Sequence, residues 1–334
     1  MTLPEVSIVI PCLNEEKTIQ GLLEAILHQT CSPGGLEVII SDGISKDRTR
    51  TIIADFQEEH PELMITVVDN PARRIPTGLN QAIRAARAPI ICRMDAHTLP
   101  APDYVERSVA ALKAGLGDNV GGVIDVRPGA NTIMASAISV ATAHPLGVGD
   151  AKYRWTTRAG EADTVAFGTY YKAKVEEIGY YNEELRANED YEFNSRLRAA
   201  GGKIWIDPQI RAVYYSRSTL KSLAKQYFSY GFWKFRMLRN NPQTLRWRQA
   251  LPPVFVLGIL MLLLLSAIFS WARVLLIICL GVYLLVLTAA SAKVALNKSD
   301  LRLVFGIPLA IMSMHFCWGA GFWWSILNPK KEGI

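Results

Sequence analysis

The chain has 334 residues, of which 50% are hydrophobic, and it carries a formal net charge of +6 at pH 7. Its five cysteines show no paired spacing, which argues against a zinc site and against a disulfide framework. Residues 1–216 mix charged and apolar side chains, whereas 250–327 is almost wholly apolar, so the composition excludes a purely soluble protein and indicates a soluble domain followed by a membrane segment.

The first part of the chain alternates strand-like and helix-like segments. Short apolar runs predict strands, and the segments between them place apolar residues on one helical face. The predicted strands are VSIVIP (6–11), LEVIISDG (36–43), LMITVVD (63–69) and PIICRMDA (89–96), and the predicted helices are 14–29, 45–60, 77–88 and 103–115. This alternation predicts an α/β domain with a parallel sheet and helices on both faces.

Polar side chains follow each predicted strand, where ligands bind in sheets of this kind. They are Asn14 and Glu15 after the first strand, Asp42 after the second, Arg73 and Arg74 after the third, and Asp95 and His97 after the fourth. No GxGxxG turn follows the first strand, so the usual dinucleotide-binding turn for phosphates is missing.

The Asp-Ala-His sequence offers another way to hold a diphosphate. Alternate side chains point the same way in an extended segment, so Asp95 and His97 can share one divalent ion. The simpler interpretation is a strand that leaves the core and meets solvent.

Four motifs in this order resemble family 2 glycosyltransferases, which have the nucleotide-sugar-binding, Rossmann-like fold called GT-A. They are SIVIPCLNEEKTI, DGISKDRT, RMDAHT and GYYNEELRANEDYEF, and the match extends from residue 4 to about 215. The chain is most similar to membrane glucosyltransferases of the succinoglycan-biosynthesis type, which share the Asp-Ala-His turn, a NED motif and a C-terminal membrane segment.

The resemblance implies a donor site at the edge of the sheet. The implied nucleotide-sugar-binding residues are Pro11, Asn14, Glu15, Asp42, Arg74 and Asp95, with Glu15 and Asp42 near the uracil and ribose. Asp95 and His97 would hold Mn²⁺ or Mg²⁺ against the diphosphate. Histidine stands where the family pattern has a second acid, which favours Mn²⁺.

The NED motif supplies the implied catalytic base. Asn188 is a predicted N-cap, and Glu189 and Asp190 fall in the first turn of the helix that follows. Acidic residues there stabilise a helix through its dipole alone, which is the alternative interpretation. The resemblance implies that Asp190 deprotonates the acceptor hydroxyl in an inverting transfer and that Glu189 lies on the acceptor side.

Two loops with glycine and aromatic residues occupy the region where the family binds its acceptor. Their candidate acceptor residues are His144, Arg154, Arg158 and Gly168. The three basic side chains could meet a lipid diphosphate, and Gly168 could let the acceptor approach the backbone closely. The alternative for each basic residue is a solvated loop position.

The C-terminal part predicts a basic amphipathic interfacial region at 217–249 and membrane spans at about 250–270, 274–292 and 303–327. Eight cations and no acid lie in the interfacial region, which favours anionic membrane lipids over nucleic acid as the partner. The alternative is an ordinary surface helix. The third apolar run contains Gly306 and Pro308, so it either crosses fully or is kinked or re-entrant.

The sequence as a whole predicts a multi-pass inner-membrane enzyme with a cytoplasmic catalytic domain. The expected reaction moves a hexose, glucose by resemblance, from a UDP-sugar to a polyprenyl-diphosphate-linked saccharide in exopolysaccharide or surface-glycan synthesis. One alternative is direct transfer to polyprenyl phosphate, and another is a non-catalytic nucleotide-binding scaffold of a glycan synthase complex. A homo-oligomer or a synthase complex is compatible with all three.

Overall fold

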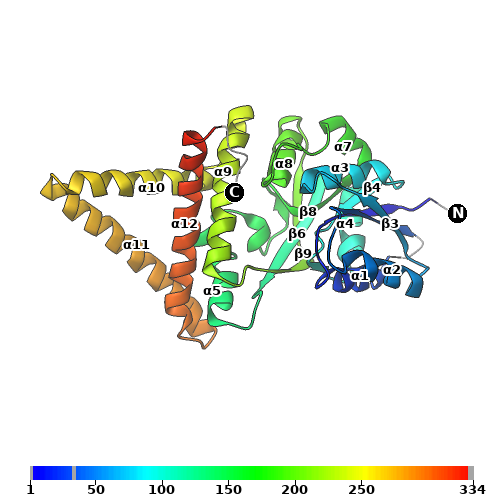
Figure 1. Ribbon diagram of the computed structural model, residues 1–334, viewed down its shortest axis with the longest axis horizontal. Helices are drawn as coiled ribbons and strands as arrows, with labels where there is room; N and C mark the ends of the chain where they lie inside the picture. Colours follow the sequence, from blue (N-terminus) through cyan, green and yellow to red (C-terminus); the bar gives the residue numbers. More distant parts are fainter. Residues whose placement is uncertain (1–2, 32–34, 330–334) are drawn as a thin grey trace. The chain divides into compact units, whose positions relative to one another are not determined.

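The computed structural model describes residues 3–31 and 35–329, which form two compact units. The first contains the residues up to Asp125 together with Ala151–Tyr214. The second contains Val126–Asp150 and the residues from Tyr215 on. The two units are described separately below (Figure 1).

The first unit is built on a mixed sheet that extends the predicted one. Its strand order is β3-β2-β1-β4-β8-β6-β9-β5, with β7 paired to β9. The strands are β1 (Val6–Cys12), β2 (Leu36–Asp42), β3 (Met64–Asp69), β4 (Ile90–Arg93), β5 (Thr98–Pro100), β6 (Asn119–Arg127), β7 (Gly160–Glu161), β8 (Ala166–Tyr171) and β9 (Ile204–Tyr215). The four predicted strands are β1 to β4, and they pair in parallel as expected.

Antiparallel pairing begins at β4, where β8 joins the sheet and β6 then joins β8. β9 pairs antiparallel with both β5 and β7. The prediction of a parallel sheet is therefore correct for its first half only. β1 and β2 are buried along almost their whole length because helices cover both of their faces.

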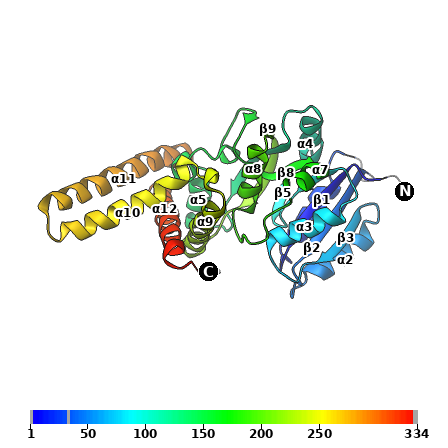
Figure 2. The ribbon, with the colours of Figure 1, turned by 90° about the horizontal axis from the view of Figure 1, so that it is seen from above.

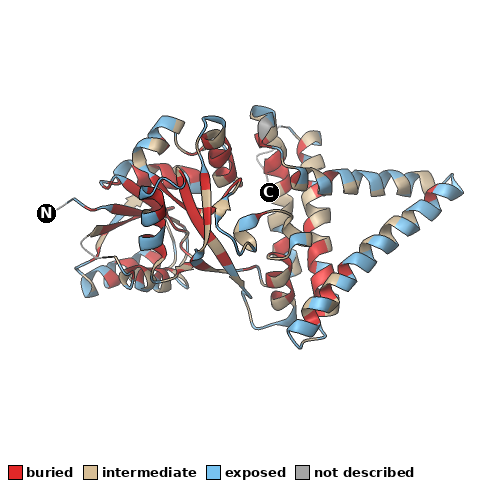
Figure 3. Cartoon of the chain, turned by 180° about the vertical axis from the view of Figure 1, so that it is seen from behind, coloured by how far each residue is buried: buried red, intermediate tan, exposed pale blue. Residues whose placement is uncertain are grey.

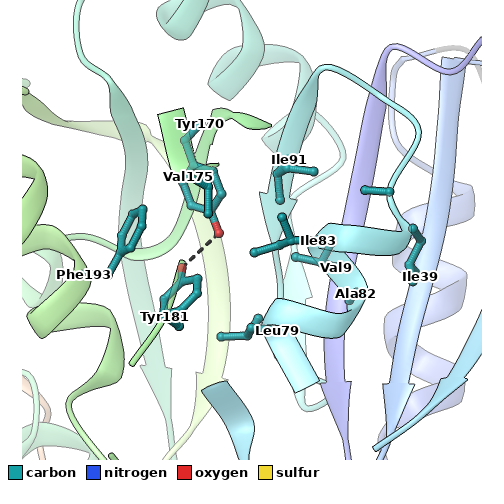
Figure 4. Packing of buried hydrophobic residues seen from close by; sticks show 11 residues of the cluster. Val9, Ile39, Leu79, Ala82, Ile83, Ile91, Tyr170, Val175, Tyr181 and Phe193 are labelled. Atoms are coloured by element: carbon teal, nitrogen blue, oxygen red, sulfur yellow. Dashed lines mark hydrogen bonds between the residues drawn. The ribbon is translucent and has the colours of Figure 1, made fainter. Parts of the chain in front are cut away.

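Helices cover the two faces of this sheet (Figure 2). They are α1 (Ile19–Leu27), α2 (Thr49–Glu59), α3 (Ile75–Ala85), α4 (Tyr104–Lys113), α7 (Lys172–Ile178) and α8 (Glu189–Ala199). The predicted apolar face of α1 is buried as expected. On one face, α3, α7 and α8 pack with Val9, Ile39 and Ile91 of the strands into a core cluster, in which Tyr170 and Tyr181 share a hydrogen bond (Figure 4).

The second unit is helical. Its helices are α5 (Ile133–Ala141), α6 (Pro145–Val148), α9 (Leu220–Asn240), α10 (Trp247–Ser266), α11 (Ser270–Asn297) and α12 (Leu303–Leu327). α10, α11 and α12 are long and apolar enough to span a membrane. Few residues of α10 and α11 are buried, whereas α12 has many buried residues (Figure 3).

The segment Val126–Asp150 belongs to this unit because it contacts the long helices directly. α5 packs on α12, where a Cβ on Gly306 would lie 2.7 Å from the Cβ of Ala137. The Leu146 carbonyl is 2.9 Å from Nε2 of His315 on α12. Asp150 forms an ion pair with Arg248 at the start of α10.

The predicted interfacial region contains α9, but its lysines are not equivalent. Lys221 and Lys225 are exposed, whereas Lys234 is completely buried and donates from Nζ to the Thr244 carbonyl at 2.7 Å. Lys234 therefore stabilises the turn after α9 and is not available to lipid headgroups.

Candidate functional site

The turn after β1 is fastened to the loop after β2. Asn14 adopts a left-handed conformation (φ 54°), which asparagine tolerates better than most residues. Its backbone N–H donates to Ser45 Oγ at 2.8 Å, and its Oδ1 accepts from the Lys46 N–H at 2.9 Å. Glu15 N–H donates to Thr49 Oγ1 at 2.8 Å. Asn14 and Glu15, with the half-buried Pro11, thus lie in one ordered edge of the sheet.

Asp42, at the end of β2, is fully buried. Its carboxylate accepts from the N–H and Oγ of Ser45 and from Nε of Arg50, which also reaches Asp69 at 2.5 Å. Through these bonds Asp42 orders the loop to which Asn14 is hydrogen-bonded. A direct contact with the nucleotide stays a prediction.

The ends of β1 and β4 bring Glu15, Asp95 and His97 together. β1 and β4 are adjacent parallel strands, and Nδ1 of His97 lies 3.4 Å from Oε1 of Glu15. Partial burial acts to raise the pKa of Glu15, but hydrogen bonds with His97 and Thr18 outweigh it and hold this pKa below its ordinary value. Glu15 is therefore an anion beside the imidazole.

The donor atoms at this edge suit a divalent ion that is shared with a diphosphate. No cluster of three or more His, Cys, Asp or Glu suited to a metal occurs within 3–31 and 35–329. Ions at nucleotide sites, however, take one or two carboxylates and complete their coordination with phosphates. Both hydrogen bonds that Asp95 accepts from Arg93 fall on Oδ1, which leaves Oδ2 for an ion. Asp95 and His97 thus fit Mn²⁺ or Mg²⁺ in chemistry.

Arg93 is a central residue of this site that the sequence motifs did not single out. Its side chain is 6% exposed, and Nη2 lies 3.2 Å from Oδ1 of Asp95 and 3.0 Å from Oε1 of Glu189. One buried guanidinium thus joins the Asp-Ala-His turn to the NED motif. The sequence does contain a signal for it, because a charged residue inside an apolar strand is usually buried and then needs a buried partner.

The NED motif begins α8 with both of its acids near Arg93. Asn188 occupies the N-cap position with φ 64°, as predicted. Its side chain makes no capping hydrogen bond, however, so the predicted cap is confirmed in its position but not in its hydrogen bond. Burial raises the pKa values of both Glu189 and Asp190, although the positive charge of Arg93 opposes this. Asp190 is partly accessible, and Glu189 is buried. Asp190 is thus the more exposed acid of this pair.

A second connection holds the loop that precedes α8. Asn80 of α3 bonds to the Tyr181 backbone in both directions and donates to Glu183 Oε1 at 2.7 Å. Arg74, at the N-cap of α3, donates to the Glu183 carbonyl at 3.3 Å. Arg74 therefore contacts the loop that delivers Asp190, and its assignment to the nucleotide sugar stays a prediction.

Of the predicted acceptor residues, Arg154 lies beside the Asp-Ala-His turn. Its guanidinium is 5.4 Å from the centre of the Tyr214 ring, and the His97 ring packs on the same tyrosine at 5.7 Å. Tyr214 thus connects a predicted acceptor residue to a predicted metal ligand. No sequence motif marks this tyrosine.

The other acceptor residues have local roles that the structure defines. A Cβ on Gly168 would lie 2.1 Å from Oδ1 of Asn119, so packing already requires glycine there. His144 belongs to the second unit and accepts the Leu146 N–H on Nδ1, which caps α6. Arg158 is exposed in a turn closed by Thr156. Acceptor contacts of these three residues stay predictions.

Comparison with known proteins identifies relatives of this chain. Residues 7–179 match the model of the family described as glycosyl transferase family 2. The chain is 31% identical over 333 residues to the succinoglycan biosynthesis protein ExoA of Rhizobium meliloti, covering 97% of this chain and 96% of the relative. It is 27% identical, over 98% of both chains, to a dolichyl N-acetyl-α-D-glucosaminyl phosphate 3-β-D-2,3-diacetamido-2,3-dideoxy-β-D-glucuronosyltransferase of Methanococcus voltae.

Solved structures show the same fold. A mannosyltransferase from Pyrobaculum calidifontis, in complex with GDP-Man and Mn²⁺, superimposes with a TM-score of 0.61 at 20% identity, covering 94% of this chain and 88% of that one. TarS of S. aureus with UDP-GlcNAc superimposes with a TM-score of 0.51 at 14% identity, over 92% and 91% of the two chains.

Proposed function

Because this chain belongs to glycosyl transferase family 2, with a GT-A fold and C-terminal helices apolar enough to span a membrane, we propose that it is a membrane-bound inverting hexosyltransferase. The proposed donor is a UDP-sugar, UDP-glucose in the first instance. The proposed acceptor is a saccharide linked to a polyprenyl diphosphate, extended during exopolysaccharide or surface-glycan synthesis.

One observation carries this proposal: Arg93 holds the Asp-Ala-His turn and the NED motif together, so that Asp95 and Asp190 lie near one buried charge. In the proposed reaction the acceptor hydroxyl oxygen bonds to the anomeric carbon while the bond from that carbon to the diphosphate breaks. The hydroxyl proton passes to the carboxylate of Asp190, a contribution of about 10²–10⁴-fold. Asp190 suits this role because it is the accessible acid of the motif.

In this proposal the donor binds at the edge of the sheet formed by the ends of β1, β2 and β4. Asn14, Glu15 and Asp95 lie there, and the loop held by Asp42 orders Asn14. Mn²⁺ or Mg²⁺ held by Asp95 and His97 would neutralise charge on the leaving diphosphate. The mannosyltransferase neighbour, which contains GDP-Man and Mn²⁺, supports a nucleotide sugar and a metal of this kind.

Two relatives support a lipid-linked saccharide in a glycan pathway. The Rhizobium relative is named for succinoglycan biosynthesis, and the Methanococcus relative is named for an acceptor that is a sugar on dolichyl phosphate. The apolar helices support an acceptor that stays in the membrane, and exposed Lys221 and Lys225 support contact with anionic lipids on the cytoplasmic side. Transfer directly to polyprenyl phosphate is the competing reaction.

Product analysis tests the proposal. Purified full-length protein is given labelled UDP-glucose, Mn²⁺, and either a polyprenyl-diphosphate saccharide or polyprenyl phosphate. The proposal expects one hexose to be added to the saccharide, as measured by product mass. Labelled polyprenyl phosphate glucose as the sole product would support the competing reaction. If neither transfer to an acceptor nor hydrolysis of the donor is seen with any of a panel of donors and acceptors, a non-catalytic scaffold would be favoured.

A further inference from the structure

The third apolar helix, α12, differs from the other two in its packing. In its most apolar stretch 44% of residues are buried, against 11% in both α10 and α11. α9, α5, α10 and α11 all pack on it. Its exposed large side chains form one stripe at helical spacing, made of Phe305, Leu309, Trp324 and Leu327. The large exposed side chains of α12 therefore all lie on one side of the helix.

α9 lies along α12 in the same direction for most of its length (Figures 1 and 2). Tyr227 contacts Trp318 at a ring separation of 6.4 Å, and further along Phe235 contacts Phe322 at 5.3 Å. The backbones approach closely, since a Cβ on Gly231 would lie 2.0 Å from the carbonyl oxygen of Trp318. Any depth in a membrane that α12 reaches is therefore also reached by α9.

The charges of α9 argue against a position across a membrane. Lys221, Lys225 and Arg239 are exposed. Because Tyr227 contacts Trp318, Lys225 lies close to the level of the midpoint of α12. A crossing α12 would hold this lysine near the bilayer centre, where an exposed charged side chain is strongly disfavoured. The exposed cations of α9 favour an interfacial position instead.

The positions of charge along the chain favour the same placement. Lys298 and Arg302 precede α12, and Lys330 and Lys331 follow it. The excess of Lys and Arg in cytoplasmic loops favours both ends of α12 on the cytoplasmic side. The contacts of α12 with α10 fall at the first turns of α10, where Trp318 donates to the Gln249 carbonyl and Trp323 to the Pro253 carbonyl.

We propose that α12 does not cross the membrane but lies with α9 in the headgroup layer of an anionic bilayer. α10 and α11 then form a two-span hairpin that is the only crossing part of the described chain. The exposed stripe of α12 contacts the upper acyl chains, and Lys221 and Lys225 contact anionic headgroups. This inference rests on the membrane location proposed above.

Labelling from the two sides of the membrane tests the inference. The five natural cysteines of the full chain are replaced by serine, and one cysteine is introduced as Ser270→Cys at the hairpin tip, as Ser299→Cys between α11 and α12, or after Ile334. Right-side-out and inverted vesicles are treated with a membrane-impermeant maleimide. We expect Ser270→Cys to react in right-side-out vesicles, and the other two positions to react in inverted vesicles. Reaction of the C-terminal cysteine in right-side-out vesicles would overturn the inference.

A second readout keeps the test decisive if the cysteine-free chain folds poorly. The natural chain with a C-terminal epitope tag is probed with antibody in both vesicle types, and the tag should be reached in inverted vesicles alone. Washing the vesicles with alkaline carbonate distinguishes a failure of the proposed membrane location from a failure of the two-span arrangement. Protein that washes off the vesicles contradicts membrane insertion altogether, whereas inserted protein with an outward-facing tag contradicts only the two-span arrangement.

Discussion

At the scale of single residues, Arg93 determines the geometry of the site. Its buried side chain is placed between Asp95 and Glu189, and its cation lies 5.8 Å from the centre of the Tyr181 ring. Nη1 has no hydrogen-bond acceptor among the residues that the structure describes. A buried charge that loses one partner typically costs about 3–5 kcal/mol, so this junction strongly favours one arrangement of the two motifs.

We predict that Arg93→Lys lowers kcat by about 10–10²-fold. Lysine keeps the charge but cannot hold two carboxylates in one planar fork, so the acids shift by a fraction of an ångström or more. Affinity for UDP with Mn²⁺ should change much less than kcat. Arg87→Lys is the matched control, because Arg87 pairs with buried Glu37 at the opposite end of the strands and should leave kcat unchanged. Equal kcat values for both variants would contradict the role of Arg93.

Asp190→Asn should lower the rate of transfer by about 10²–10⁴-fold, because the amide cannot accept the hydroxyl proton. Binding of UDP with Mn²⁺, followed by calorimetry, should stay within a few-fold of the natural protein. Transfer at the natural rate would remove Asp190 from the mechanism. Loss of nucleotide binding would instead assign it to the donor site.

The pH dependence of kcat/KM should reflect the raised pKa of Asp190. Burial raises the pKa of its carboxyl group, and only the ionised form accepts a proton. Activity should therefore fall, as the pH is lowered, at a pH above the ordinary aspartate pKa of about 3.9. A profile without an acidic limb above that value would contradict the assignment of Asp190 as the base, provided that circular dichroism shows the protein folded throughout.

At the scale of secondary-structure elements, the long helices of the second unit pack through glycine and proline positions. Gly231 and Gly321 let α9 and α12 meet at backbone distance. Pro253 has no N–H, so the Gln249 carbonyl in α10 lacks its helical donor, and Nε1 of Trp318 donates to it at 3.2 Å. Apolar composition alone does not show which of these helices pack on protein and which face lipid.

Gly231→Ala should destabilise the protein by about 1–3 kcal/mol, because its Cβ would overlap the Trp318 carbonyl and force the helices apart. Gly258→Ala on α10 is the control, since no atom beyond its own stretch of helix backbone lies within 4 Å of its added Cβ. This control should be neutral or slightly stabilising. Thermal unfolding in detergent measures both variants, and a midpoint for Gly231→Ala equal to that of the control would contradict close packing of α9 on α12.

At the scale of the whole molecule, the sequence predicted what depends on local pattern. β1 to β4, the apolar face of α1, the family and the three apolar helices were all recognisable from short stretches. The antiparallel half of the sheet was not, because β8, β6 and β9 pair across long separations in sequence. Burial of Lys234 was also missed, since only the folded turn at Thr244 supplies its partner.

The candidate site was predictable to a similar degree. Asp95, His97 and the NED acids stand out as polar groups after apolar or turn segments, and the structure places Asp95 and Glu189 on the same arginine. Tyr214 and Asn80 could not be found, because an aromatic residue in a strand and an amide in a helix resemble core and surface positions. The membership of Val126–Asp150 in the second unit likewise depends on tertiary contacts with α10 and α12.

The configuration of the product tests the central claim most directly. If Asp190 activates an acceptor hydroxyl on the face of the sugar opposite the diphosphate, a donor with an α-linked nucleotide must give a β-linked product. We predict that NMR of the oligosaccharide released after a single transfer shows the anomeric coupling of a β-linked hexose. An α-linked product would mean that the acceptor and the leaving group share one face, and it would contradict the mechanism assigned to Arg93, Asp95 and Asp190.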